Sequence, residues 1–339
     1  MKFSSIFNFA AVAAGAVIRR GDDFIELDDR DISATLYQGL DFYVQWAQAA
    51  YCNAEVANGT AVTCAYDNCP SVTANKATII TAYTGDDTEV AVIVGLDPTR
   101  KEIVVSYRGS SNIRNWIVNL SFLMTSCDLV DDCYVHDGFH WAWEETGSTV
   151  MAVVAAAKAA HPDYTVVATG HSLGAAVATI AAGYLRAAGF PCDLYTYGSP
   201  RVGNPAFVEF ITNQAGAEYR VTKLNDPVPR LPPIFSGYRH TSPEYWIDDG
   251  SSSNTAYTGS DFTECLGFAN TDCNAGTFGL SITAHLNYMQ HTGSCDSGNS
   301  KKRSGLEGDS AAAARVSDAD LEVQVNKYAQ QDLDYVVSM

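Results

Sequence analysis

A serine lies between two glycines in the segment Gly170-His-Ser-Leu-Gly174, which has the pattern G-x-S-x-G. The segment follows an apolar run at residues 164–169 and precedes an Ala-rich stretch at residues 175–188, so it is predicted to form a strand-to-helix turn. The glycines let such a turn hold Ser172 exposed in a strained backbone conformation. A serine held in this way can attack a carbonyl carbon, and the Leu173 N–H at the start of the helix can stabilise the oxyanion that results.

A serine nucleophile needs a base that takes its proton and an acid that orients the base. With the serine on a turn of this kind, the order along the chain is Ser, then Asp or Glu, then His. Asp226 is the favoured acid, because it lies just past the predicted strand at residues 219–224 and so reaches the C-terminal edge of a sheet, where ligands bind in open α/β proteins. Three further carboxylates lie in a Ser/Gly/Asn-rich loop and are expected to be solvated: Asp248, Asp249 and Asp261. The spacing does not choose among the three candidate bases, which are His240, His285 and His291.

The elements that must position these residues follow one pattern. Short β-branched runs alternate with Ala-rich helical stretches along residues 32–295, with an even composition throughout. This alternation predicts one α/β domain in which a mostly parallel sheet is buried between helices on both faces. The expected strands are residues 90–94, 103–107, 164–169, 193–197 and 219–224, and the expected helices are residues 144–160 and 175–188.

The composition excludes several classes of protein. Of the 339 residues, 47% are hydrophobic and 18% are charged, so the chain can bury a core and is too apolar to be disordered throughout. The 39 Asp and Glu against 21 Lys and Arg give a net charge of −18, which leaves no cationic surface for nucleic acid or for anionic membranes. Nine cysteines and a mean hydropathy of −0.06 indicate a soluble chain from an oxidising compartment.

Six motifs, in this order and spacing, resemble the secreted fungal class 3 lipases, and the Fusarium-type extracellular enzymes in particular. They are Tyr107-Arg-Gly-Ser-Ser111, Gly170-His-Ser-Leu-Gly174, Tyr197-Gly-Ser-Pro-Arg-Val-Gly-Asn204, Asn225-Asp-Pro-Val-Pro-Arg-Leu-Pro-Pro233, Ser242-Pro-Glu-Tyr-Trp246 and Ala284-His285. The resemblance covers residues 32–295. It implies the α/β-hydrolase fold, with a mostly parallel central sheet, a nucleophile elbow and a helical lid.

The resemblance also implies roles for the matching residues. Ser172 takes the role of the nucleophile, Asp226 that of the orienting acid, and His285 that of the general base. The N–H and hydroxyl of Ser110 are implied as the partner of the Leu173 N–H in the oxyanion hole. His240 is then left with a structural role.

The segment at residues 111–123 bears on the substrate. Its apolar residues follow the i, i+3, i+4, i+7 spacing of an amphipathic helix: Ile113, Trp116, Ile117 and Leu120. A core helix would have the same pattern. We favour a lid, because a short helix next to the oxyanion serine could shield an apolar cleft in water and turn its stripe outward at a lipid surface.

The cysteines predict disulfides rather than a metal site. The resemblance implies the pairs Cys52 with Cys295, Cys64 with Cys69 and Cys127 with Cys133, and local spacing suggests Cys265 with Cys273. Cys192 is left over, either as a buried free thiol or as one half of an intermolecular bridge. No C-x-x-C pair or H-E-x-x-H pattern is present in the sequence, so we expect no metal and no cofactor. Glycosylation sequons begin at Asn58 and Asn119.

Both ends of the chain have the character of processed segments. Residues 1–16 are expected to form a signal peptide, and residues 17–31 an N-terminal extension in which Arg19-Arg20 could be cleaved, although dibasic pairs also occur by chance. Residues 296–339 read as a polar linker and an acidic extension. The extension is predicted to form an amphipathic helix capped by Ser317, with this apolar face: Leu321, Val325, Tyr328, Leu333 and Val336. It is either a solvated tail or a pro-peptide that is released at Lys302-Arg303. We favour the pro-peptide.

These features together predict a secreted serine carboxylester hydrolase that acts at lipid–water interfaces, most simply a triacylglycerol lipase that forms an acyl-enzyme. A phospholipase A1 or a feruloyl-type esterase is the alternative on the same scaffold, and the latter would be expected to have a more polar flap. A silent binding protein is disfavoured, because every triad position holds a competent residue type. The expected partners are the lipid surface and its esters, with no nucleic acid and no stable protein partner. We also predict that the tail lowers activity by resting its apolar face on the lid region.

Overall fold

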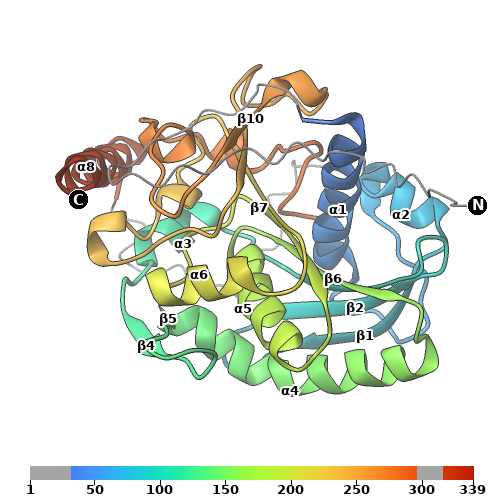
Figure 1. The fold of residues 1–339 in the computed structure, drawn as a ribbon. Coiled ribbons are helices and arrows are strands. Elements are labelled where there is room, and N and C mark those ends of the chain that lie inside the picture. Colours follow the sequence, from blue (N-terminus) through green and yellow to red (C-terminus); the bar gives the residue numbers. More distant parts are fainter. Residues whose placement is uncertain (1–31, 296–315) are drawn as a thin grey trace, which may run out of the picture.

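An eight-stranded sheet forms the centre of the protein, in a computed structural model that describes residues 32–295 and 316–339 (Figure 1). The strands lie in the order β1-β2-β3-β6-β7-β8-β9-β10. Their bounds are Thr78–Thr84, Ala91–Asp97, Glu102–Tyr107, Thr165–His171, Cys192–Tyr197, Glu218–Lys223, Glu244–Ile247 and Phe262–Cys265. The pairs from β3 to β9 are parallel, and the pairs at both edges are antiparallel. The expected signal peptide, N-terminal extension and linker lie outside the described residues.

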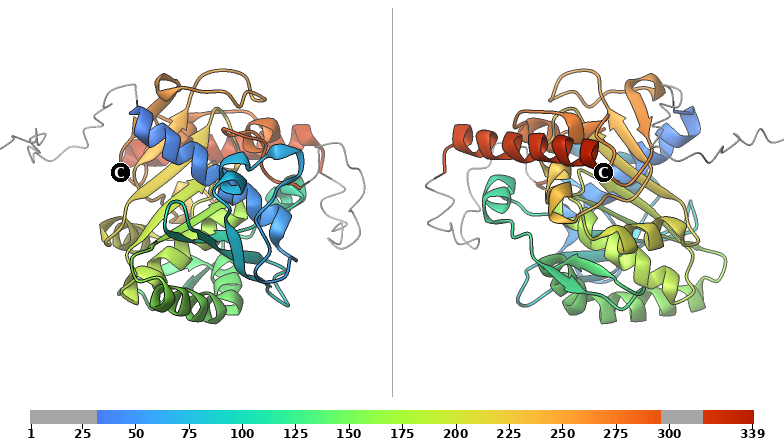
Figure 2. Two further views of the ribbon diagram at one scale, coloured as in Figure 1. Left: turned by 90° about the vertical axis from the view of Figure 1, so that its right-hand side faces the viewer. Right: turned by 60° about the vertical axis from the view of Figure 1, so that its left-hand side comes forward.

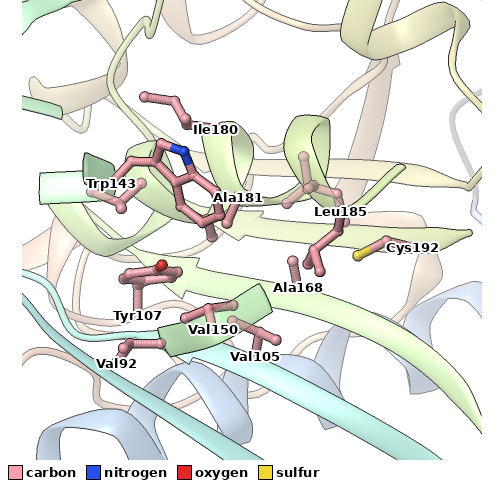
Figure 3. Packing of buried hydrophobic residues seen from close by; sticks show 14 of the residues in the cluster. Val92, Val105, Tyr107, Trp143, Val150, Ala168, Ile180, Ala181, Leu185 and Cys192 are labelled. Atoms are coloured by element: carbon pink, nitrogen blue, oxygen red, sulfur yellow. The ribbon is translucent and has the colours of Figure 1, made fainter. Parts of the chain in front are cut away.

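Helices cover both faces of this sheet, as the alternating pattern predicted. Helices α4 (Asp137–Ala160), α5 (Leu173–Ala187) and α6 (Pro205–Asn213) pack on one face, and α1 (Ala34–Asn53) and α2 (Pro70–Ala74) lie on the other. Successive residues of the central strands alternate between the two cores. Val105 and Ala168 face α4 and α5 (Figure 3), while Val104 and Val167 face α1. A strand buried on both faces needs apolar residues throughout, which is why the runs read as continuous.

The expected strands and helices are all present, with shifted bounds. The largest shift is in α4, which begins at Asp137 instead of residue 144, with His136 as its N-cap. Its extra turns bury Phe139 and Trp143 in the core beside the sheet. Helix α1 and strands β1, β9 and β10 were not predicted. A second, two-stranded sheet joins β4 (Met124–Ser126) to β5 (Tyr134–His136).

Four disulfides join eight of the nine cysteines in the expected pairs: Cys52–Cys295, Cys64–Cys69, Cys127–Cys133 and Cys265–Cys273. The first pair spans 243 residues and ties the end of α1 to the end of the domain. Cys192 is a free thiol in the core beside Leu185 and Ala168 (Figure 3). Burial raises the pKa of this thiol to about 12, so it is protonated and inert at neutral pH.

The acidic tail forms helix α8 (Asp318–Ser338), and Ser317 caps it by accepting a hydrogen bond from the Asp320 N–H. The helix lies along the outside of the domain, close to α3 (Ile113–Asn119) (Figure 2). Of the expected apolar face, Leu321 and Val325 are buried, and Tyr328, Leu333 and Val336 are partly buried. The other two fully buried positions, Ala329 and Asp332, were not expected. Within the described residues, no helix combines the length and the apolar character that are needed to cross a membrane.

Candidate active site

Ser172 stands at the junction of β6 and α5, as expected of a strand-to-helix elbow. Its backbone has φ 59° and ψ −132°, a combination that costs energy for a residue with a side chain. Gly170 has to be a glycine, because a Cβ there would lie 2.7 Å from the Ala175 backbone nitrogen. The elbow therefore holds Ser172 at the N-terminus of a 15-residue helix, whose dipole favours negative charge at that point.

Asp226 and His285 form a buried pair next to this elbow. Asp226 follows β8, and His285 ends the short helix α7 (Ile282–His285). The imidazole Nδ1 lies 2.8 Å from Asp226 Oδ2 and 3.0 Å from Oδ1, and neither side chain is exposed. A carboxylate in this place fixes the Nδ1–H tautomer and stabilises the charged imidazolium.

Two reactive atoms at the site have no hydrogen-bond partner among the described residues: Ser172 Oγ and His285 Nε2. Buried polar atoms are nearly always paired, so an unpaired hydroxyl and an unpaired ring nitrogen call for an explanation. The ring of His171, the residue before the serine, lies 4.5 Å from the His285 ring, so the elbow and the base occupy one neighbourhood. The pair can exchange a proton once a substrate brings the two atoms into line.

The other two candidate bases lie elsewhere. His240 is buried, and its Nε2 donates to the Pro229 carbonyl at 2.7 Å. Burial, and then the charges of Arg220 and Arg201, lower its pKa well below the ordinary value, so it stays neutral. The Nδ1 of His291 lies 3.3 Å from Asn287 Oδ1. Of the three histidines, His285 alone contacts Asp226 within the described part of the chain.

Ser110 and Leu173 line the same groove, of about 410 Å³, that opens beside the nucleophile. Ser110 follows β3, the strand next to β6, so the chain reaches the elbow from the neighbouring strand end. The Ser110 hydroxyl accepts a hydrogen bond from the Asn112 N–H at 3.3 Å. A backbone N–H from each side of the groove is the arrangement that stabilises an oxyanion.

The segment expected to be a lid forms α3, which ends at Asn119, so Leu120 lies just outside the helix. Its stripe is divided between two environments. Trp116 and Leu120 line the groove, whereas Ile113 and Ile117 are buried against Val228, Leu231 and two residues of α8. The helix therefore covers apolar surface next to the site, and it is itself covered on its outer side.

Helix α8 supplies that cover. Leu321 and Val325 complete the cluster that holds Ile113 and Ile117. On the solvent side, Arg114 Nε pairs with Asp318 at 2.6 Å. Towards the other end of α8, Asp332 inserts into the domain and pairs with Arg201 at 3.1 Å, where both side chains are almost fully buried.

Sequence reasoning missed two hydrogen-bond donors that hold the carboxylate of the pair. The Tyr288 hydroxyl donates to Asp226 Oδ2 at 2.6 Å, and the Val228 N–H donates to Oδ1 at 2.9 Å. Tyr288 lies outside α7, in an irregular segment three residues after His285, so no periodic pattern pointed to it. The described residues contain no group of three or more His, Cys, Asp or Glu side chains placed to hold a metal ion. Asn58 and Asn119 are both exposed.

The known proteins that are similar to this chain are lipases. Residues 104–236 match the family described as Lipase (class 3). The chain is 47% identical over 347 residues to "Secreted mono- and diacylglycerol lipase 1" of Fusarium solani. This match covers 100% of this chain and 99% of the relative. It is 39% identical to "Secreted mono- and diacylglycerol lipase A" of Penicillium cyclopium, over 78% of this chain and 88% of the relative.

Solved structures give the same result for the fold. The crystal structure of a mono- and diacylglycerol lipase from Aspergillus oryzae superposes with a TM-score of 0.73 at 39% identity, over 76% of this chain and 98% of that one. Such lipases have the α/β-hydrolase fold expected from the motifs. With this likeness along its whole length, the chain belongs to the class 3 lipase family.

Proposed function

We propose that this protein is a secreted lipase that cleaves acylglycerols at lipid–water interfaces, with a triad of Ser172, His285 and Asp226. One observation carries the proposal. Within the described residues, Ser172 Oγ and His285 Nε2 are buried without a hydrogen-bond partner, and the other ring nitrogen of His285 is held by the Asp226 carboxylate. An inert scaffold has no reason to keep a strained serine and two unpaired polar atoms together.

The chemistry follows from these positions. Ser172 Oγ attacks the ester carbonyl carbon as its proton passes to His285 Nε2, and the carbonyl oxygen becomes an oxyanion that the N–H groups of Ser110 and Leu173 stabilise. Collapse of this intermediate expels the alcohol, which takes the proton from His285 and leaves an acyl group on Ser172. A water then attacks the acyl carbon as one of its protons passes to His285 Nε2. His285 returns that proton to Ser172 Oγ when the bond to the acyl group breaks and the fatty acid leaves.

Interfacial action is supported by the cover over the site. Helix α3 places Trp116 and Leu120 along the groove, and Trp141, 50% exposed, adds an aromatic ring to its wall. Apolar surface of this kind is costly to expose to water but favourable to expose to lipid. We therefore propose that residues 113–120, which include α3, act as a lid over the groove.

The substrate class rests on the relatives. Those named for a substrate are mono- and diacylglycerol lipases, so partial glycerides are the first candidates, before the triacylglycerol favoured from the sequence. The same relatives are named as secreted, which supports secretion of this chain by its N-terminal segment. We propose residues 32–295 as the hydrolase domain and residues 296–339 as its regulatory extension.

The test is fatty acid release by the purified protein from separate emulsions of dioleoylglycerol, mono-oleoylglycerol and trioleoylglycerol, with phosphatidylcholine dispersions and methyl ferulate in parallel. We expect the partial glycerides to be cleaved at least ~10-fold faster than trioleoylglycerol, a discrimination of about 1.4 kcal/mol in transition-state binding. Equal rates on all three glycerides would support the broader triacylglycerol lipase. Activity confined to phosphatidylcholine or to ferulate would overturn the acylglycerol proposal.

The tail is expected to restrain the lid. Val325 is 1% exposed against α3, whereas Val323 on the outer face of α8 is 69% exposed. Val325→Asp would bury a charge in this contact and, with the loss of about 2 kcal/mol of apolar burial, favour release of α8 by more than ~10-fold. We expect a several-fold higher initial rate on emulsified diacylglycerol for this variant, and no change for Val323→Asp.

A chain that ends at Arg303 provides the complementary measurement. It lacks α8 altogether and is expected to match or exceed the Val325→Asp rate. If this chain, the Val325→Asp variant and the full-length protein release fatty acid equally fast, α8 is a structural extension and has no role in regulation.

A further inference from the structure

Two loops that must be held together for this chemistry are joined by a chain of hydrogen bonds beneath the elbow. The oxyanion loop at Gly109 and Ser110 leaves β3, and the base loop carries His285 after α7. Between them lie Tyr51, in the last turn of α1, and His171, the residue before the nucleophile. Neither residue has a part in the triad.

The contacts form a continuous path. The Gly109 backbone packs directly against the Tyr51 hydroxyl oxygen, with its N–H on that side, and this oxygen lies 3.0 Å from His171 Nδ1. The other ring nitrogen, His171 Nε2, lies 2.8 Å from the backbone carbonyl oxygen of His285. His171 is fully buried, and a Cβ on Gly109 would lie 2.5 Å from the His171 carbonyl oxygen and 3.1 Å from Ser172 Cβ. The path therefore runs directly behind the nucleophile.

The chemistry of the groups gives every bond a direction. A carbonyl oxygen only accepts, so the proton of His171 must be on Nε2, where it donates to His285. Burial and the neighbouring His285 lower the pKa of His171 well below its ordinary value, so the ring is neutral and Nδ1 has a lone pair. The Tyr51 hydroxyl must then donate to Nδ1, which leaves its oxygen free to accept from Gly109. Each group has one role, and none can be reversed without losing a bond.

Tyr51 is itself anchored to the segment that follows the base loop. Its neighbour Cys52 is bonded to Cys295. One turn earlier, Gln48 accepts from the Gly293 N–H at 3.2 Å and donates to the Ser294 carbonyl at 2.8 Å. The last turn of α1 is thus fastened to the chain on the C-terminal side of His285 as well as to His285 itself through His171. It forms a rigid support from which both loops are held.

We infer that Tyr51 and His171 are positioning residues that hold the oxyanion loop and the base loop at a fixed separation around Ser172. This inference rests on the proposed function of Ser172 and His285, and it assigns a role to the residue at the second position of the G-x-S-x-G motif. Bonds to the transition state depend steeply on position, and an error of about 1 Å can cost ~10²-fold in rate. Loss of the path therefore lowers the rate of the chemical step and leaves substrate binding intact.

The test uses the full-length chain and a soluble ester, p-nitrophenyl butyrate, so that the lipid surface plays no part. Tyr51→Phe removes a single hydroxyl and is expected to lower kcat by about 10-fold with KM within about 2-fold, because the misplaced groups act only in the transition state. His171→Leu, which removes both hydrogen bonds, is expected to lower kcat further. His171→Gln keeps a donor for His285 and an acceptor for Tyr51, so it should recover most of the loss.

The matched control is Tyr107→Phe, which also removes a buried tyrosine hydroxyl, one that lies 3.1 Å from Thr146 Oγ1 on the side facing α4. This variant is expected to keep kcat although it loses a similar amount of stability. The decisive measurement is the double variant Tyr51→Phe/His171→Leu. If the residues act as one path, it is no slower than His171→Leu alone, whereas independent packing defects multiply.

The outcomes separate the inference from the function on which it rests. Wild-type protein that does not cleave the ester, or cleaves it equally well as Ser172→Ala, removes the proposed function. Active wild-type protein with full kcat in Tyr51→Phe, or a fall in kcat that Tyr107→Phe reproduces at the same loss of Tm, overturns the positioning role alone.

Discussion

Ser172→Ala is expected to abolish ester hydrolysis, with a loss in kcat of about 10⁶-fold and no loss of fold. The hydroxyl oxygen supplies the bond that forms the acyl-enzyme, and no other described group in this groove takes its place. Removing Oγ also removes a buried polar atom that lacks a hydrogen-bond partner within the described chain, so the free energy of unfolding should stay the same or rise. A loss of activity that comes without a loss of stability identifies a functional group.

The measurement is kcat on dioleoylglycerol emulsion and on p-nitrophenyl butyrate, together with Tm by calorimetry. Ser106→Ala is the matched control. Ser106 is also fully buried, on β3, and its hydroxyl donates to the Trp46 carbonyl at 2.9 Å on the α1 side of the sheet. It should keep its activity and lose stability. Residual hydrolysis above about 1% in Ser172→Ala, with the correct mass, would place the nucleophile elsewhere and bring back the binding-protein hypothesis.

The local sequence could predict those parts of the site whose residues lie close together in the sequence. The elbow depends on a strand, two glycines and a helix within some twenty residues, and each has its own signal. Asp226 was predictable because it lies just past a predicted strand, three residues after the end of β8. His285 was not separable from His240 and His291 by spacing, since it lies on a four-residue helix among irregular loops, where no periodicity exists to read.

Helix α1 shows why a well-formed element can escape prediction. Residues 42–50 are all buried, because the helix packs against the central strands of the sheet and against α2. A helix buried on nearly every side has no polar face, so the stripe that identifies a surface helix is missing. Its polar residues, among them Gln48 and Tyr51, are then placed by tertiary contacts, and the bonds they make to residues 171 and 293–294 span more than a hundred positions.

The tail shows the opposite case, in which a clear stripe predicted a helix and its cap but not all of its buried face. The pattern continued through Leu333 and Val336, whereas the structure buries Asp332. The cause is Arg201, which is 1% exposed and forms an ion pair with Asp332. A buried carboxylate is tolerable only where a buried cation meets it, and such a partner 131 residues away is invisible to a local pattern.

Asp226→Asn is the second variant with a very large expected effect, about 10⁴-fold in kcat. The reason lies in the groups that surround the carboxylate. The Val228 N–H donates to Oδ1 and cannot reverse its role, so the asparagine has to keep its carbonyl oxygen at that position. Its NH₂ group then takes the place of Oδ2, where it faces His285 Nδ1 and the Tyr288 hydroxyl.

The tyrosine hydroxyl can turn and accept a hydrogen bond, but the imidazole has to change its tautomer. With an NH₂ donor at 2.8 Å, Nδ1 must carry the lone pair, so the ring proton moves to Nε2 and His285 can no longer take a proton from Ser172. The side chain keeps its shape and its hydrogen bonds, which is why we expect Tm to change little. The base is disabled while the fold is unaffected.

Asp248→Asn is the control, because Asp248 was the other kind of carboxylate considered, exposed in a loop where it accepts a hydrogen bond from Thr263. We expect it to keep wild-type kcat on p-nitrophenyl butyrate. Combining Asp226→Asn with Ser172→Ala adds a further check. Residues that act as one unit do not contribute independently, so the double variant should be no slower than Ser172→Ala alone. A multiplicative loss would mean that Asp226 acts on the fold or on substrate binding, and the acid of the triad would have to be found among the remaining carboxylates.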